Sequence, residues 1–404
     1  MSPLRFLTAG ESHGPCLTIV VEGVPAGLPL TAAAIDGELA RRQLGHGRGG
    51  RQAIETDRIV FEGGVRLGHT TGGPVALRLD NRDHAAWRLA MAPEPRDPAD
   101  LAREAALADR RIERLRPGHA DWAGAVKYGL ADVRDVLERA SARETAARVA
   151  AGAIARVLLA SLGIELTSHV VRIGAEALRA DEAAAVAELD LEPLREAASR
   201  SVVRCAHPAA AARMVAAIDA AREAGTSLGG IVEVRTGALP VGLGSHVHWD
   251  RRLDGRLAQA VASIQAIKGV AFGEGFALAS RTGQEAHDEF EGGFERRSNR
   301  AGGLEGGMTN GQPLCLQAAM KPISTQARAL AGAHLADGEV VPAHFERADT
   351  CAVPAAGVVA EAMVAWVLAD ACLEKYGGDS LDELRAHHAA SEALAWGRRG
   401  AHRG

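Results

Sequence analysis

The predicted strands and helices follow one another irregularly along this chain. Residues 17–24, 165–173 and 230–236 are rich in β-branched side chains and predict strands, with shorter strands at 58–61 and 74–79. Helices are expected between some of these strands but not between all of them. The repeating strand–helix–strand unit of a doubly wound parallel fold is therefore missing, and the pattern predicts an α+β fold.

Capping residues and chain breakers set the ends of the expected helices. Helices are expected over 31–44, 99–108, 141–162, 209–224, 250–267, 355–376 and 380–396. Ser141 and Glu144 have the spacing of a capping box, in which each side chain binds an unpaired amide of the first turn. Since no long linker interrupts the chain, we expect one domain over residues 1–396, followed by a frayed tail over 397–404.

Composition argues against several classes of protein. The chain has 404 residues, of which 47% are hydrophobic, so it can bury a large core. A net charge of -5 and an aromatic content of 3% disfavour a nucleic-acid-binding protein, because such proteins are usually basic and stack bases on aromatic rings. The most apolar run, 149–162, contains Arg156 and is too short to cross a membrane.

The cysteines and the N-terminus indicate a cytoplasmic protein. Five cysteines are scattered without a CxxC pair, which is typical of a reduced compartment. The first residues show no basic segment followed by an apolar one, so no signal peptide is expected. Neither a metal-binding motif nor the phosphate-binding patterns GxGxxG and GxxxxGK[ST] occur, and we expect no bound metal.

Four segments combine charged side chains with glycines or a helix start. In the first, 10–14, His13 lies at a backbone bend and can transfer protons near neutral pH. The second, 114–121, places Arg116 and His119 around a Pro-Gly turn, where they could hold an anion and donate a proton. Taken alone, a surface turn is the simpler interpretation of either segment.

The third segment is an arginine set interspersed with glycines, made of Arg41, Arg42, Arg48 and Arg51. Guanidinium groups bind phosphate and carboxylate through two hydrogen bonds, and glycines let backbone amides approach a ligand. In a net-acidic chain this local density predicts a small polyanionic ligand. A solvated, flexible loop is an equal alternative.

The fourth segment is the helix start at 141–144, whose amides can bind a phosphate with help from Arg139 and Arg143. Further along the chain, Asp349 could act as a base or pair with Arg347. Together, the four segments indicate an enzyme that acts on a small, phosphorylated anion through histidines and a carboxylate.

Seven stretches in the same order resemble the chorismate synthase family. Three of them, 10–25, 138–152 and 347–361, are similar to the family's signatures. The other four are 116–121, 265–269, 298–303 and 321–325. The resemblance thus spans nearly the whole chain, from residue 10 to residue 361. One departure is Ala348, where the family usually has Ser, His or Phe, so a contact from a side chain at that position is in doubt.

The resemblance implies a β-α-β sandwich, with helices packed between antiparallel sheets, in a cytoplasmic homotetramer. It implies an anti 1,4-elimination of phosphate and the C6 hydrogen from 5-enolpyruvylshikimate 3-phosphate, which gives chorismate. Reduced FMN is required although the reaction is redox-neutral. Some members also reduce their flavin with NADPH, and the sequence leaves that activity open. No nucleic acid or membrane partner is implied.

The resemblance also implies roles for individual residues. His13 would be an acid near the departing phosphate, His119 would protonate or stabilise the reduced flavin, and Asp349 would take part in proton removal through the flavin N5. Arg42 and Arg48 would bind anionic groups of substrate or NADPH. The flavin site would be lined by Arg139, Ala140, Ser141, Gln265, Ala266, Gly306, Lys321, Pro322, Ile323, Ser324, Thr325 and Arg347.

Two rival interpretations remain. A flavin reductase or another FMN oxidoreductase would need a nicotinamide site, and no dinucleotide fingerprint occurs. A non-enzymatic anion-binding or nucleic-acid-binding protein could use the arginine loops, and its affinity would fall steeply with salt.

Overall fold

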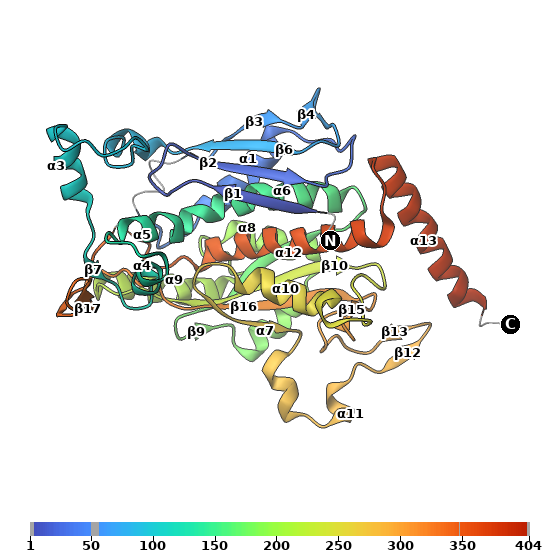
Figure 1. The fold of residues 1–404 in the computed structure, drawn as a ribbon. Coiled ribbons are helices and arrows are strands. Elements are labelled where there is room, and N and C mark those ends of the chain that lie inside the picture. Colours follow the sequence, from blue (N-terminus) through green and yellow to red (C-terminus); the bar gives the residue numbers. More distant parts are fainter. Residues whose placement is uncertain (1–3, 50–55, 347, 402–404) are drawn as a thin grey trace.

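Two antiparallel sheets form the outer layers of the molecule (Figure 1). The computed structural model describes residues 4–49, 56–346 and 348–401. The first sheet has the order β1-β2-β6-β3, with β1 (Arg5–Ala9), β2 (Cys16–Glu22), β6 (Val75–Asp80) and β3 (Ile59–Gly63). The second has the order β11-β16-β10-β8-β9, with β11 (Ile267–Phe272), β16 (Pro313–Met320), β10 (Gly230–Ala238), β8 (Leu166–Ile173) and β9 (Glu176–Ala177).

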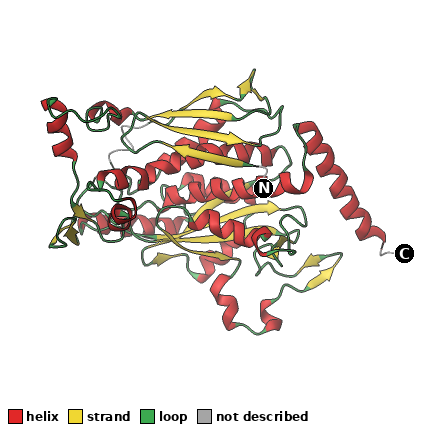
Figure 2. Cartoon of the chain, in the orientation of Figure 1, coloured by secondary structure: helices red, strands yellow, loops and turns green. Residues whose placement is uncertain are grey.

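Three helices lie between the sheets (Figure 2). They are α1 (Ala32–Gln43), α6 (Thr145–Ala160) and α12 (Val353–Tyr376). Alternation along the strands explains the layering, because in β2 the buried residues Leu17, Ile19 and Val21 alternate with outward-facing ones. The predicted sandwich of helices between antiparallel sheets is confirmed.

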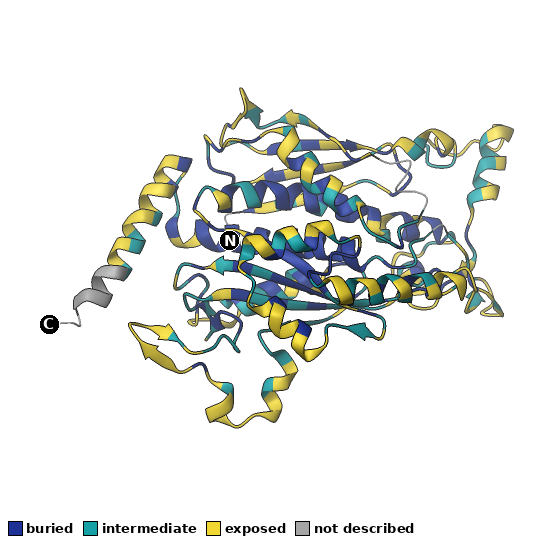
Figure 3. Ribbon diagram, turned by 180° about the vertical axis from the view of Figure 1, so that it is seen from behind, coloured by how far each residue is buried: buried dark blue, intermediate teal, exposed yellow. Residues whose placement is uncertain are grey.

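The central helix α12 is apolar nearly all the way round. Every residue from Val353 to Leu373 is buried, and the helix lies in the interior of the molecule, where Figure 3 shows the ribbon in dark blue. By length and a mean hydropathy of 1.7 the helix could cross a membrane, but all of its apolar 18-residue stretch is buried within the protein. It is a longer apolar segment than 149–162, the run that the sequence singles out, and it is the core around which the fold is built.

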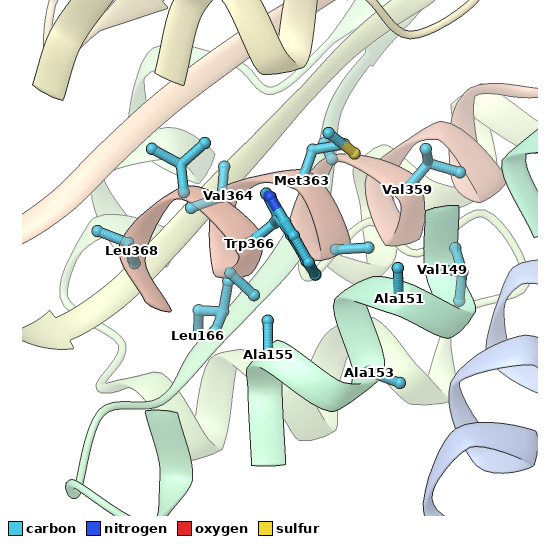
Figure 4. Close-up of a cluster of buried hydrophobic side chains, with 14 of the residues drawn as sticks. Val149, Ala151, Ala153, Ala155, Leu166, Val359, Met363, Val364, Trp366 and Leu368 are labelled. Atoms are coloured by element: carbon cyan, nitrogen blue, oxygen red, sulfur yellow. The ribbon is translucent and has the colours of Figure 1, made fainter. Parts of the chain in front are cut away.

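Small residues let α6 and α12 approach closely. Ala151 and Ala155 of α6 point toward α12, and the Trp366 ring of α12 reaches toward them (Figure 4). At Gly152 a Cβ atom would lie 2.4 Å from the Cβ of Ala362 and 2.6 Å from its Cα. The crossing of the two helices therefore requires glycine at this position.

One carboxylate inside α12 ties the central helices together. The Glu361 side chain is fully covered and binds Arg41 of α1 and Arg156 of α6, at 2.8 and 2.9 Å. It also binds Arg204 at 3.0 Å. Burial alone would raise the pKa of Glu361, but the three guanidinium groups hold it at about 2.

The remaining elements surround this sandwich. The helices are α3 (Leu101–Arg110), α4 (Asp121–Tyr128), α5 (Arg134–Ala140), α7 (Ala180–Ala187), α8 (Leu191–Arg200), α9 (Pro208–Glu223), α10 (Leu253–Ala262), α11 (Gly283–Ala286) and α13 (Leu381–Ala401). Short strands are β4 (Val65–Arg66), β5 (His69–Thr70), β7 (Arg114–Leu115), β12 (Phe290–Gly292), β13 (Glu295–Arg296), β14 (Leu304–Glu305), β15 (Met308–Thr309), β17 (Ala331–His334) and β18 (Val340–Pro342).

Some predicted boundaries are wrong. The helix expected over 250–267 ends at Ala262, and residues 267–272 form β11 instead. Helix α13 continues to Ala401, beyond the predicted end at 396. In both places tertiary pairing or helix propagation outweighs the local signal. The single domain over 1–396 stays a prediction.

Replacing Gly152 by alanine tests the helix crossing. We expect the variant to lose on the order of 1–3 kcal/mol of unfolding free energy, because the new methyl group collides with Ala362. The matched control is Gly37→Ala on the exposed face of α1, where a Cβ meets nothing within 4 Å. Helix propensity predicts a gain of up to about 1 kcal/mol there. Equal stability of both variants in urea unfolding would contradict the packing argument.

Candidate active site

A cavity of about 490 Å³ opens where the N-terminal end of α12 meets loops from distant parts of the chain. Residues 352, 355, 356 and 359 of α12 form part of its wall. The start of α6 and the end of β16 form other parts. Two helix N-termini thus meet the cavity, and their dipoles favour a negatively charged ligand.

Most of the predicted site residues line this one cavity. They are His13, Arg42, Arg48, His119, Ala140, Ser141, Gln265, Ala266, Lys321, Pro322, Ile323, Ser324, Thr325 and Asp349. Ala266 has a φ of 67°, which strains a residue with a side chain. Its carbonyl oxygen accepts a hydrogen bond from the Lys321 backbone at 2.9 Å, so this turn joins two lining segments.

Three predicted residues are not placed at the cavity. Arg139 donates instead to the backbone oxygens of Thr8 and Gly10, at 2.9 and 3.1 Å. Gly306 lies in the turn between β14 and β15 and does not line the cavity. Arg347, like Arg51, lies outside the described residues. A flavin-binding role for Arg139, Gly306 and Arg347 stays a prediction.

His13 is held from two sides. Its ring Nδ1 lies 2.7 Å from Oε1 of Glu138, and its backbone N–H donates to Oε2 of the same carboxylate at 2.7 Å. The indole of Trp87 stacks on the imidazole with 3.9 Å between ring centroids. Nε2 lies 3.9 Å from Oδ2 of Asp83. Taken alone, the segment favours a surface turn, but the structure shows this histidine buried and fixed.

His119 has a similar neighbour. Its Nδ1 lies 2.5 Å from Oδ1 of Asp121, a side chain fully covered by protein. Arg116 donates to both oxygens of Asp121, at 2.8 and 2.9 Å. Burial would raise the pKa of Asp121, but hydrogen bonds from Arg116 and His119 hold it well below its usual range. Arg116 is thus paired by protein and is less free to bind an anion than the sequence suggests.

A buried aspartate, Asp57, joins two arginines of the cavity wall. Its oxygens lie 3.3 Å from Nη1 of Arg42 and 2.6 Å from Nη1 of Arg143. Burial lowers the pKa of Arg42 to about 10, against the opposing charge of Asp57. Arg143 is fixed further by a 2.9 Å hydrogen bond from Nε to Asn81. Because Arg42 and Arg143 share the single negative charge of Asp57, this group of three side chains keeps a net positive charge at the cavity wall.

Asp349 closes the opposite side of the arginine loop. Its Oδ2 accepts from Arg48 at 2.6 Å and its Oδ1 from the Gly49 backbone at 2.6 Å. A Cβ on Gly49 would lie 2.9 Å from the carbonyl oxygen of Ala348. The sequence suggests that such glycines let a ligand approach the backbone. At Gly49 the close neighbour is instead the protein's own backbone, because the missing side chain lets the loop contact residues 348–349.

The predicted capping box at Ser141 is only partly present: the serine caps the turn, but the glutamate does not. Ser141 does cap the turn, because its Oγ accepts from the Arg143 backbone at 3.2 Å. Glu144 does not reach back to Ser141, because it binds Arg148 at 2.9 Å and Gln265 at 3.1 Å. The carboxylate therefore holds a cavity residue in place instead of completing the cap.

Permanent cations outnumber carboxylates on the described wall. Arg42, Arg48, Arg116, Arg143 and Lys321 face only Glu346 and Asp349. Of the carboxylates behind the wall, Asp57 and Glu138 carried no sequence signal that sets them apart from surface acids. Glu138 lies in the family-like stretch 138–152, but the resemblance implies no role for it. Only their place in the fold identifies them.

Comparisons with known proteins agree on one family. The family model described as chorismate synthase matches residues 4–373. A chorismate synthase of Gloeobacter violaceus is 53% identical over 395 residues, covering 96% of this chain and 100% of the relative. One of Acidothermus cellulolyticus is 55% identical over 389 residues, covering 95% and 96%. A solved structure described as the crystal structure of chorismate synthase has a TM-score of 0.75 and 41% identity, covering 96% of each chain.

Replacing Asp57 by asparagine tests the arginine pair. We expect a loss of roughly 3–5 kcal/mol in unfolding free energy, because two buried guanidinium groups lose their shared counter-ion. Inorganic phosphate should raise the melting temperature of this variant more than that of the wild type, by occupying the arginine site.

The matched control for this test is Glu62→Gln. Its partner Arg78 lies at 2.9 Å and both side chains are about half exposed, so a change within about 0.5 kcal/mol is expected. Wild-type stability of Asp57→Asn, with the same response to phosphate, would contradict the assigned role.

Proposed function

Since this chain belongs to the chorismate synthase family of carbon–oxygen lyases, we propose that it eliminates phosphate and the C6 hydrogen from 5-enolpyruvylshikimate 3-phosphate to give chorismate. The observation that supports this reaction most is one cavity holding an excess of cations, two carboxylate-bound histidines and Asp349. The substrate carries a phosphate and two carboxylates, which match that excess of positive charge.

The cavity fits reduced FMN as the cofactor. Apolar side chains such as Ile264, Pro322 and Ile323 form part of the wall, and charged and hydrogen-bonding side chains form the rest. Among the described residues, Nε of Arg48, Nη2 of Arg143 and Oε1 of Gln265 are buried without a hydrogen-bond partner, and bound ligands could relieve such a cost. When bound, reduced flavin supplies electron density transiently without net redox change.

The residues that would hold the flavin come from three segments of the wall. They are Ala140 and Ser141, Gln265 and Ala266, and the run from Lys321 to Thr325. Lys321 also donates to the carbonyl oxygen of Gly118, which ties the last of these segments to the His119 turn. This tie keeps His119 beside the proposed flavin position.

The chain's own groups divide the remaining work. Arg42 and Arg48 bind the anionic groups of the substrate and orient it. His13 supplies a proton to the departing phosphate, and His119 holds a proton at the flavin side of the cavity. Asp349 accepts the proton that leaves C6, while Arg48 and the Gly49 amide fix its carboxylate. The buried wall excludes water from these transfers.

A cytoplasmic homotetramer is part of this proposal. Large apolar side chains stand exposed on a protruding segment, with Phe276 89%, Phe290 60% and Phe294 54% exposed, and such surfaces are usually covered by a partner. Sedimentation equilibrium would distinguish a tetramer from a monomer.

An anaerobic assay tests the reaction. Purified protein with chemically reduced FMN and 5-enolpyruvylshikimate 3-phosphate should release chorismate and phosphate in equal amounts, and only with reduced flavin. No product from folded, flavin-binding protein would overturn the proposal. In a second arm under air, steady NADPH oxidation with FMN would show that the protein also reduces its own flavin.

Replacing Asp349 by asparagine tests the proton acceptor. We expect kcat to fall by about 10²–10⁴-fold with the fold retained, because the amide cannot take up the proton. The matched control is Asp254→Asn, which removes an arginine-paired carboxylate away from the cavity and should leave kcat unchanged. Near wild-type turnover of Asp349→Asn would remove the carboxylate from the mechanism.

A further inference from the structure

Both histidines of the cavity have the same relation to a buried carboxylate. Nδ1 lies 2.7 Å from Glu138 in His13 and 2.5 Å from Asp121 in His119. Both carboxylate side chains are fully covered, and neither lines the cavity. We infer that Glu138 and Asp121 are positioning residues that make Nε2 the proton-exchanging nitrogen of each histidine. The inference rests on the proposed function for its catalytic consequence but not for its geometry.

Glu138 fixes both the backbone and the ring of His13. One oxygen accepts the backbone N–H at 2.7 Å, so that oxygen is an acceptor and the carboxylate is held in one orientation. The other oxygen faces Nδ1, and Arg134 approaches it at 3.4 Å. Turning the ring over would put a carbon against this oxygen, while Trp87 covers a ring face. Nδ1 therefore donates to Glu138.

At His119 two neighbours compete for Nδ1. Nη2 of Arg116 lies 3.0 Å away and can only donate, which alone would make Nδ1 an acceptor. Oδ1 of Asp121 is closer, at 2.5 Å, and an unprotonated Nδ1 at that distance would set two lone pairs against each other. Arg116 already donates to both oxygens of Asp121, so it needs no bond to the ring. The hydrogen therefore belongs on Nδ1.

The consequence is the same for both rings. With Nδ1 as a donor, the neutral imidazole accepts a proton at Nε2 and the charged one releases it from Nε2. Nε2 of His13 lies 3.9 Å from Asp83, too far for a direct hydrogen bond, so this contact does not keep it from a ligand. The carboxylate on the far side stabilises the charged ring without taking its proton.

The variants Glu138→Gln and Asp121→Asn test this inference in the full-length protein. Each keeps the shape of the side chain but replaces one acceptor oxygen by an NH₂ donor. A donor facing Nδ1 favours the tautomer with hydrogen on Nε2. In hydrolase triads the same exchange lowers kcat by about 10⁴-fold. Here we expect kcat to fall by about 10²–10⁴-fold and KM to change by less than about threefold.

The decisive readout is the tautomer, measured by ¹⁵N NMR of histidine-labelled protein at a pH where the rings are neutral. His13→Asn and His119→Asn assign the signals. The wild type should show Nδ1–H at both rings, with a shift to Nε2–H at His13 in Glu138→Gln and at His119 in Asp121→Asn. Wild-type signals with hydrogen on Nε2 would overturn the inference, even if a variant fails to fold.

The matched control is Glu233→Gln. Glu233 is a buried carboxylate 3.2 Å from Nε2 of His169, outside the cavity, so its replacement should leave kcat and both signals unchanged. Unchanged kcat in Glu138→Gln and Asp121→Asn would overturn the positioning role. The NMR measurement needs no substrate. It therefore tests the role of the two carboxylates even if the anaerobic assay shows that the proposed reaction does not occur.

Discussion

The fold depends on burying one helix that is apolar on every side. A helix of this kind cannot lie on a surface, so α12 needs cover all round. The second sheet, α1, α6 and α10 provide most of that cover, and the small residues of α6 let the layers close without gaps. Glu361, a charged residue buried in this helix, is neutralised by three arginines. Burial of α12 also places its N-terminal end at the cavity.

Charged side chains serve two purposes at the cavity: some are placed to bind an anionic ligand, and others hold the first group in position. Arginines at the wall carry the excess of positive charge, and carboxylates behind it, such as Asp57, hold them in fixed orientations. Such pairs contribute little net stability, because the cost of removing charges from water offsets their attraction. Their value lies in preorganisation, since the groups need not reorganise when an anion binds.

The sequence predicts the fold class, the family and most of the lining residues. Family-like stretches succeed because they carry residues that line the cavity, such as His119 and the run 321–325. Local patterns fail where tertiary pairing decides, as at 267–272, where a strand pairs with β16 in place of the predicted helix end. They also miss Glu138 and Asp57, because an acid behind the wall differs from a surface acid only by its place in the fold.

The position of α12 in the chain has a consequence for synthesis. The helix at the centre of the molecule begins at Val353, so the strands of both sheets, the last of which ends at Met320, leave the ribosome before it. Until then the second sheet carries an apolar face that this helix covers, and a partly exposed sheet invites aggregation. The many pairings between distant residues, such as Leu4 with Asp370, also slow folding. The nascent chain therefore needs a chaperone or rapid completion, and no ligand can rescue it earlier, because the cavity does not yet exist.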